Sequence, residues 1–297
     1  MESVTTLGDL LVEAEQLFLS HGLYFGHGTT SAWDESVVLV SHAFHLGPDP
    51  QSDVLDKEVT EDHAKFFRGL CNRRVKERIP APYLTSKAWF CGLEFFVDPR
   101  VIIPRSPISE LVFYQFSPWL LRQPDSLLDL CTGSGCIGIA CAYEFDEAMV
   151  TISDICREAL KVARRNVEAH SLLDRVEIVE SDCFSGLNGK KFDLIVCNPP
   201  YVDSQEFATM PAEYRHEPAR AMLSGEDGLE FTRQLLREVI DHLNPQGILV
   251  VEVGNSAIAL EKEFTEVPFI WPSVGEGDSG VFILSHELLH ENSHFFS

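Results

Sequence analysis

Apolar residues near the start of the chain recur at the spacing of an amphipathic helix. The first run places its apolar side chains three or four residues apart: Leu7, Leu10, Leu11, Ala14, Leu17 and Phe18. Residues with this spacing lie on one face of a helix. Two further apolar runs follow Asp34 and Asp62. The pattern predicts a small bundle of helices over residues 1–80.

A stiff, proline-rich stretch follows the predicted bundle. The residues Ile79-Pro80-Ala81-Pro82 restrict the backbone, and we place a domain boundary beside them. Residues 88–97 then form two short runs of β-forming residues around Gly92, which predicts a hairpin. We therefore expect a helical domain at 1–80, a β-hairpin linker at 81–107 and a larger domain at 108–297.

From Ser126 onwards, apolar runs of strand length alternate with helical patterns. The predicted strands cover residues 126–130, 149–153, 176–180, 192–197 and 247–253. This alternation is typical of the parallel sheet of an α/β fold. Near the end of the chain, the runs at 268–271 and 281–284 flank a glycine-rich segment and predict a further hairpin.

Glycine or acidic residues follow three of these predicted strands. Gly133 and Gly135 form a turn before a helix, where a ligand can approach backbone N–H groups. Asp154 ends the second strand, a position from which a carboxylate accepts both ribose hydroxyls of a nucleoside. Asp182, beside Cys183, is placed to accept from an adenine amino group. Because no lysine lies in the glycine turn, the pattern favours a neutral or cationic nucleoside over a phosphate. Each feature alone is also explained by a tight turn or a capping aspartate.

The fourth strand ends in Asn198-Pro199-Pro200-Tyr201. Neither proline has an N–H to donate, so the strand ladder ends there. The Asn198 carboxamide oxygen and a neighbouring backbone carbonyl then form two acceptors, which suit a planar NH2 group with its two donors. Tyr201 supplies an aromatic face to cover that group. The structural alternative is a strand followed by a proline-rich turn.

The composition limits the classes of partner. Lys and Arg number 23 against 46 Asp and Glu, a net charge of −23. Such a chain is repelled by nucleic acid and attracted to basic partners, although acidity that only aids solubility is the alternative. The sequence has no apolar run long enough for a membrane span and no secretory signal. The eight cysteines lack the spacing of a zinc site and suggest reduced thiols. We expect a cytoplasmic protein without a metal, a membrane partner or direct DNA binding.

The glycine turn and the fourth strand end together carry a family resemblance. Asp-Leu-Cys-Thr-Gly-Ser-Gly at 129–135 followed by Asn-Pro-Pro-Tyr at 198–201 resembles S-adenosylmethionine-dependent methyltransferases. The chain is most similar to the HemK/PrmC family, which methylates the N(5) side-chain amide of glutamines in proteins. Residues 24–29 and 213–218 are similar to the branch that modifies ribosomal protein L-three. The resemblance implies a helical substrate-recognition domain, the hairpin linker and a seven-stranded, Rossmann-like class I methyltransferase sheet.

The resemblance also implies a role for individual residues. The residues expected to bind S-adenosyl-L-methionine are Cys131, Thr132, Gly133, Ser134, Gly135, Asp154, Asp182, Cys183 and Asn198. Those expected to act in catalysis are Asn198, Pro199 and Tyr201. Those expected to contact the substrate are Asn198, Pro199, Pro200, Tyr201 and Arg105. One departure from the family is Cys156, which stands where a serine commonly caps the following helix.

Several alternatives remain open at this level. The same Asn-Pro-Pro-Tyr stretch suits the amino group of adenine in DNA, although the acidic charge argues against that substrate. A second branch of the family acts on peptide release factors. A catalytically inactive module that binds a basic ribosomal protein is a third alternative. For the L-three branch that the resemblance implies, the substrate is either free L-three or a ribosome-assembly intermediate.

Overall fold

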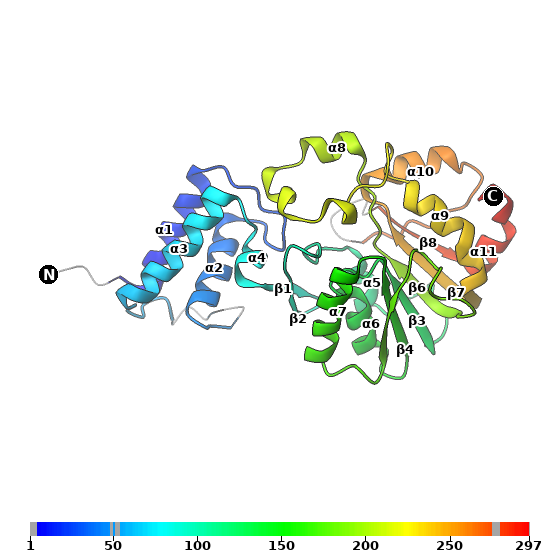
Figure 1. The fold of residues 1–297 in the computed structure, drawn as a ribbon, viewed down its shortest axis with the longest axis horizontal. Coiled ribbons are helices and arrows are strands. Elements are labelled where there is room, and N and C mark those ends of the chain that lie inside the picture. Colours follow the sequence, from blue (N-terminus) through cyan, green and yellow to red (C-terminus); the bar gives the residue numbers. More distant parts are fainter. Residues whose placement is uncertain (1–4, 48–49, 51–53, 275–279, 297) are drawn as a thin grey trace. The chain divides into compact units, whose positions relative to one another are not determined.

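The computed structural model describes residues 5–47, 50, 54–274 and 280–296, and its chain divides into two compact units (Figure 1). Unit 1 comprises residues 1–88 together with 211–216, and unit 2 comprises 89–210 and 217–297. In the described residues, no helix is both long and apolar enough to cross a membrane.

Unit 1 is helical, as the apolar spacing predicts. Its α-helices are α1 (Leu7–Ser20), α2 (Ala32–Ala43), α3 (Glu61–Glu77) and α4 (Ala81–Thr85). Thr6, Ser31 and Thr60 cap the first three helices, each accepting a backbone N–H with its side-chain oxygen. The buried faces of the helices meet in one apolar cluster. The short α4 begins within the proline-rich stretch, where proline fits the first turn of a helix.

A buried group of charges attaches residues 211–216 to the helices of unit 1. Arg74 is 1% exposed, and its guanidinium contacts Glu35 at 2.5 Å and Glu213 at 3.2 Å. Glu213 also accepts from Arg78 at 3.2 Å and from the Tyr24 backbone N–H at 3.1 Å. Removing one partner of such a buried ion pair costs about 3–5 kcal/mol. A segment that follows Asn198 in the chain is therefore part of the helical unit.

The predicted hairpin is present. Strands β1 (Lys87–Phe90) and β2 (Leu93–Phe96) form a two-stranded sheet. Cys91 and Gly92 connect them with φ values of 49° and 75°. Two positive φ values in a two-residue turn match the twist of the flanking strands.

Unit 2 contains a six-stranded sheet in the order β5-β4-β3-β6-β7-β8. The strands are β3 (Ser126–Leu130), β4 (Met149–Asp154), β5 (Val176–Glu180), β6 (Phe192–Cys197), β7 (Leu243–Glu252) and β8 (Val281–Ser285). The pairs from β5 through β7 are parallel, and β8 is antiparallel to β7. The chain runs outward from β3 to β5 and then returns to β6 on the other side of β3. The carboxyl ends of β3 and β6 therefore flank the switch point, where open α/β sheets bind ligands.

Helices cover both faces of this sheet (Figure 1). Helices α5 (Ile108–Phe113), α6 (Cys136–Glu144) and α7 (Arg157–Ala169) share one apolar cluster with alternate strand residues such as Leu127. Helices α9 (Glu230–Glu238), α10 (Ala257–Glu263) and α11 (His286–Glu291) share the other cluster with intervening residues such as Leu128. The remaining α8 (Ser204–Thr209) lies in the long connection after β6. The α/β, Rossmann-like prediction is confirmed.

The expected seventh strand is not formed in the described residues. Of the predicted terminal hairpin, 281–284 lies in β8, whereas Ile270 makes only an isolated bridge to Ile283. Pro268 and Pro272 stand on either side of Ile270 and have no N–H for a ladder. The intervening residues 275–279 lie outside the described part of the chain.

Candidate active site

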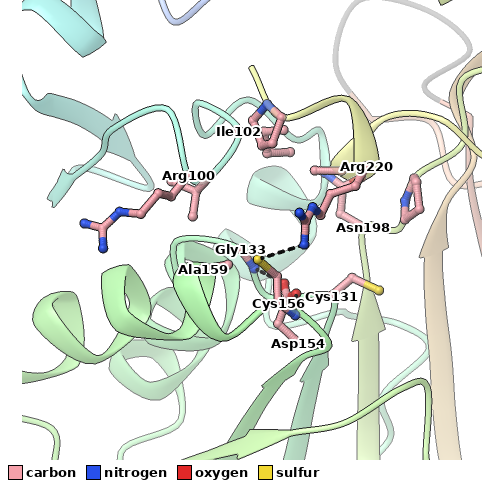
Figure 2. Close-up of a pocket in the computed structure, with 13 residues that line it drawn as sticks. Arg100, Ile102, Cys131, Gly133, Asp154, Cys156, Ala159, Asn198 and Arg220 are labelled. Carbon is pink, nitrogen blue, oxygen red and sulfur yellow. Dashed lines mark hydrogen bonds between the residues drawn. The ribbon is translucent and has the colours of Figure 1, made fainter. Parts of the chain in front are cut away.

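A cavity lies at the switch point between β3 and β6, and five residues expected from the sequence reach it. These residues are Cys131, Gly133, Asp154, Asn198 and Pro200, of which the first four are labelled in Figure 2. Cys131 follows β3 and Asn198 follows β6, two strands that are neighbours in the sheet. The cavity encloses about 500 Å³ of empty space, part of it open to solvent.

The glycine turn forms one wall of the cavity. Gly133 and Gly135 have φ values of 55° and 85°, which favour glycine. A Cβ added to Gly133 meets no atom within 4 Å, so the cavity is open at this residue. Thr132 and Ser134 are buried and do not line the cavity. The turn thus presents backbone at this wall.

A buried carboxylate holds the turn from below. Asp129 Oδ2 accepts from Thr132 Oγ1 at 2.5 Å and from the Gly138 N–H at 2.8 Å. Asp129 Oδ1 has no hydrogen-bond partner in the described residues. Burial raises the pKa of Asp129 to about 7, and its two hydrogen bonds offset this only in part. Asp129 therefore fixes the conformation of the turn, and its proton is retained close to neutral pH.

Asp154 is the acidic group of the cavity. Its Oδ2 accepts from the Gly133 N–H at 3.0 Å and its Oδ1 from the Cys156 N–H at 2.8 Å. Burial raises the pKa of Asp154, and the two backbone donors oppose the rise. Each oxygen keeps a further lone pair. A carboxylate held in this way, beside exposed glycine backbone, offers acceptors to hydroxyl groups of a ligand.

Tyr201 is held at three points after the two prolines. Its hydroxyl donates to Glu252 Oε1 at 2.7 Å, and its carbonyl accepts from Ser256 Oγ at 2.9 Å. A Cβ added to Gly254 would lie 2.6 Å from the Tyr201 ring, so a side chain does not fit there. Glu252 is 3% exposed, and its Oε2 accepts from Ser106 Oγ at 2.5 Å. Burial raises the pKa of Glu252. The carboxylate thus links the Asn-Pro-Pro-Tyr stretch to the segment before α5.

Two curated relatives match this chain over nearly its whole length. The ribosomal protein uL3 glutamine methyltransferase of Francisella tularensis is 44% identical over 97% of this chain and 93% of that protein. The enzyme of the same name from Neisseria gonorrhoeae is 42% identical and covers 97% of each chain.

This chain belongs to the family of the ribosomal protein uL3 glutamine methyltransferases.

The fold and a domain match agree with membership of the uL3 glutamine methyltransferase family. The family model described as the methyltransferase small domain matches residues 116–231 of the sequence. The hMettl16 catalytic domain, solved in complex with the MAT2A 3'UTR hairpin 6, superposes with a TM-score of 0.52 at 15% identity. That alignment covers 80% of this chain and 86% of the other, and it shows a shared fold. The resemblance to methyltransferases found in the sequence is confirmed.

In this family member, Arg105 holds a carboxylate of its own chain. Its terminal nitrogens Nη1 and Nη2 contact the Glu217 oxygens at 2.6 Å each, and Glu217 also accepts from the Ile103 N–H at 2.8 Å. Arg105 does not line the cavity. The structure thus shows a clamp between Arg105 and Glu217, and the contact with the substrate expected from the sequence stays a prediction. Adjacent residues of both segments, Ile102 and Pro218, form part of the cavity wall.

Asp182 and Cys183 do not reach the cavity lining. Asp182 is exposed, and its backbone N–H donates to Ser185 Oγ at 3.2 Å. Cys183 is buried, and the neighbouring Phe184 stacks on His242 with ring centroids 4.4 Å apart. Their contact with adenine therefore stays a prediction.

Other lining residues of this family member were not identified from the sequence. Arg100 and Arg220 both belong to the wall, as does Cys156. Arg100 lies in a loop, Cys156 precedes α7 and Arg220 lies in a short 3-10 helix, and no local pattern distinguishes them from surface residues. Glu252 was also missed, although a carboxylate inside an otherwise apolar strand is a signal of a buried partner. In the described residues, His, Cys, Asp and Glu form no group of three or more that suits a metal ion.

Proposed function

We propose that this chain transfers a methyl group from S-adenosylmethionine to the side-chain amide nitrogen of a glutamine in ribosomal protein uL3 (L-three). The proposal is supported chiefly by one observation: Asn198 and Asp154 share a single cavity at the switch point. Asp154 suits a nucleoside and Asn198 suits a planar amide. The two uL3 glutamine methyltransferases that match nearly the whole chain support the choice of substrate.

The cofactor would be held by the glycine turn and the strand ends. Residues 131–135 would contact the methionine part, Asp154 the ribose, and Asp182 with Cys183 the adenine. When bound, S-adenosylmethionine supplies an electrophilic methyl group on a sulfonium. The protein supplies the shaped site and keeps the turn in place through Asp129.

The acceptors at the end of β6 would orient the substrate. An amide nitrogen is a poor nucleophile because its lone pair is delocalised into the carbonyl. Asn198 Oδ1 and the Pro199 carbonyl would each accept one N–H of the glutamine amide and so fix its direction. Orientation of this kind contributes several kcal/mol to catalysis. The same two acceptors stabilise positive charge that develops on the nitrogen, with the Tyr201 face beside it. Pro200 completes the wall of the substrate site.

Unit 1 would recognise the protein substrate. We propose that residues 1–80 bind uL3, and that residues 81–107 connect this recognition to catalysis in 108–297. A net charge of −23 favours a basic partner of the kind that ribosomal proteins provide. Such a reaction takes place in the cytoplasm, where ribosomal proteins are made, on free uL3 or on an assembly intermediate.

The test is methyl transfer to a defined set of acceptors. The chain is incubated with S-adenosylmethionine labelled in the methyl group and, separately, with uL3, a peptide release factor and duplex DNA. We expect label in uL3 alone, and tandem mass spectrometry should place one methyl group on a glutamine side chain. Label in the release factor or in DNA would show that the chain methylates a substrate other than the proposed one. Failure to label any acceptor, with the cofactor bound, would favour a binding module.

A further inference from the structure

Arg220 is a cationic wall residue of the cavity that the proposed mechanism does not use. It lies in the 3-10 helix Ala219–Ala221 and is exposed. Its side chain points into the cavity, toward Asp154 and Cys156 (Figure 2). Its Nη1 donates to Cys156 Sγ at 3.5 Å. A thiol is a weak acceptor, and a guanidinium carries five N–H donors, so donors remain for a ligand.

The charge of Arg220 acts on the side of the cavity where Asp154 lies. Burial has the largest effect on the pKa of Asp154 and raises it, whereas the positive charge of Arg220 lowers it. Asp154 and Arg220 therefore border the same space, one with acceptors and the other with donors. A nucleoside matches both, because its ribose hydroxyls donate to a carboxylate and its base offers a π face to a guanidinium.

The other arginine of the wall is differently placed. Arg100 Nε and Nη2 contact the Asp98 oxygens at 2.9 and 2.6 Å, and its guanidinium points away from the cavity (Figure 2). Its Nη1 lies 3.8 Å from Glu158. The charge of Arg100 is thus paired outside the cavity, and Arg220 directs a guanidinium inward.

The backbone on both sides of Arg220 is fixed. On the amino-terminal side, Glu217 is held by Arg105 and by the Ile103 N–H. On the carboxyl-terminal side, the Val202 N–H donates to the Met222 carbonyl at 2.8 Å. Because Val202 directly follows Tyr201, the base of the Arg220 side chain is fixed relative to the Asn-Pro-Pro-Tyr stretch. Only the flexible side chain needs to adjust when a ligand enters.

We infer that Arg220 is a binding residue for the adenosine half of the cofactor. With a ligand bound, its planar guanidinium covers the nucleoside on the side opposite the glycine turn and contributes stacking and hydrogen bonds. This inference rests on the proposed function, because it assumes a nucleoside cofactor. The adenosine group that Arg220 would contact is common to S-adenosylmethionine, S-adenosylhomocysteine and 5'-methylthioadenosine.

Calorimetric titration of the full chain with these three ligands tests the inference. We expect Arg220→Ala to weaken all three by a similar factor of about ten, the size of one guanidinium–aromatic contact. Arg220→Lys should recover only part of the loss, because an ammonium lacks the planar face. Arg237→Ala, which removes the same charge from an exposed position on α9, should bind all three as the unchanged chain does.

Three results would overturn the inference. Unchanged affinities in Arg220→Ala would show that Arg220 makes no contact that contributes to binding. A loss confined to the two ligands that carry the amino acid would place Arg220 on the carboxylate instead. Tighter binding of S-adenosylmethionine alone would mean that Arg220 acts by repelling the sulfonium. If the unchanged chain binds none of the ligands, the proposed function fails as well, so the two failures are distinguishable.

Discussion

Asp129→Asn tests how the buried carboxylate beneath the glycine turn affects stability. Asp129 is 1% exposed, and its Oδ2 accepts from Thr132 and Gly138. Its Oδ1 has no hydrogen-bond partner among the described residues. An asparagine has nearly the same shape and still offers an oxygen to the two donors. The substitution therefore removes the ionisation with little change in packing.

The size and sign of the effect follow from the pKa of Asp129. The folded chain keeps this proton up to about pH 7, whereas the ordinary value is 3.8. Between these values the native state binds more protons than the unfolded state, so unfolding becomes easier as pH rises. The stabilisation that protonated Asp129 gives the native state is fully present below the pKa that this group has in the unfolded chain. It is lost as the pH rises through about 7. Each pH unit corresponds to about 1.4 kcal/mol. Between about pH 5 and about pH 7, a range of roughly two units, the free energy of unfolding of Asp129→Asn should rise by about 3 kcal/mol relative to that of the unchanged chain.

Urea unfolding of both chains at a series of pH values measures this difference. The free energy of unfolding of Asp129→Asn minus that of the unchanged chain should rise from about pH 4, near the unfolded pKa, and level off above about pH 7. Asp146→Asn makes the same change at an exposed position, and its difference should stay flat. A difference for Asp129→Asn that does not vary with pH, or that falls as pH rises, would refute the reasoning.

Three further substitutions test other parts of the structure. Glu252→Leu removes the carboxylate that accepts from the half-buried Tyr201 hydroxyl, which costs about 1–3 kcal/mol of stability and should lower kcat/KM. Glu252→Gln keeps an acceptor for this hydroxyl, so its kcat/KM should be close to that of the unchanged chain. An equal loss of kcat/KM in the two variants would argue that the acceptor does not matter. Gly138→Ala places a Cβ 2.4 Å from Ile152 Cγ2, and we expect thermal unfolding to show a loss of about 1–3 kcal/mol from overpacking. Cys156→Ser supplies the missing side-chain cap of α7 and should stabilise by about 1 kcal/mol in urea unfolding; an unchanged midpoint would contradict it.

Sequence analysis located the residues whose placement depends on local pattern. Gly133 and Asn198 follow strands and Asp154 ends one, and the carboxyl ends of parallel strands lie at one edge of a sheet. The alternation of strands and helices was therefore enough to bring them to one place.

Contacts between distant segments could not be read in the same way. Tyr201 and Glu252 are 51 residues apart, and Arg74 and Glu213 are 139 apart. Such pairs depend on the tertiary fold and leave no periodic signal. Arg105 shows the same difficulty, because its fixed backbone was evident whereas its partner Glu217 lies 112 residues away.

The error in strand number has a local cause. The run around Ile270 has the apolar content of a strand, but prolines at 268 and 272 limit its pairing to one bridge. The opposite error occurs at residues 243–246, which were left out of the predicted strand. There β7 begins at Leu243, although Pro245 lies within it. Composition alone does not determine where a ladder begins and ends.

The most direct test of the central claim is single-turnover methyl transfer by Asn198→Ala with uL3 and saturating S-adenosylmethionine. Asn188→Ala, a change at an exposed position, serves as the control, and S-adenosylhomocysteine binding is measured for both variants. We predict that Asn198→Ala loses transfer by at least a hundredfold, about 2.7 kcal/mol, and binds S-adenosylhomocysteine within a few fold of the unchanged chain. Near-normal transfer by Asn198→Ala would contradict the claim that its carboxamide holds the substrate amide.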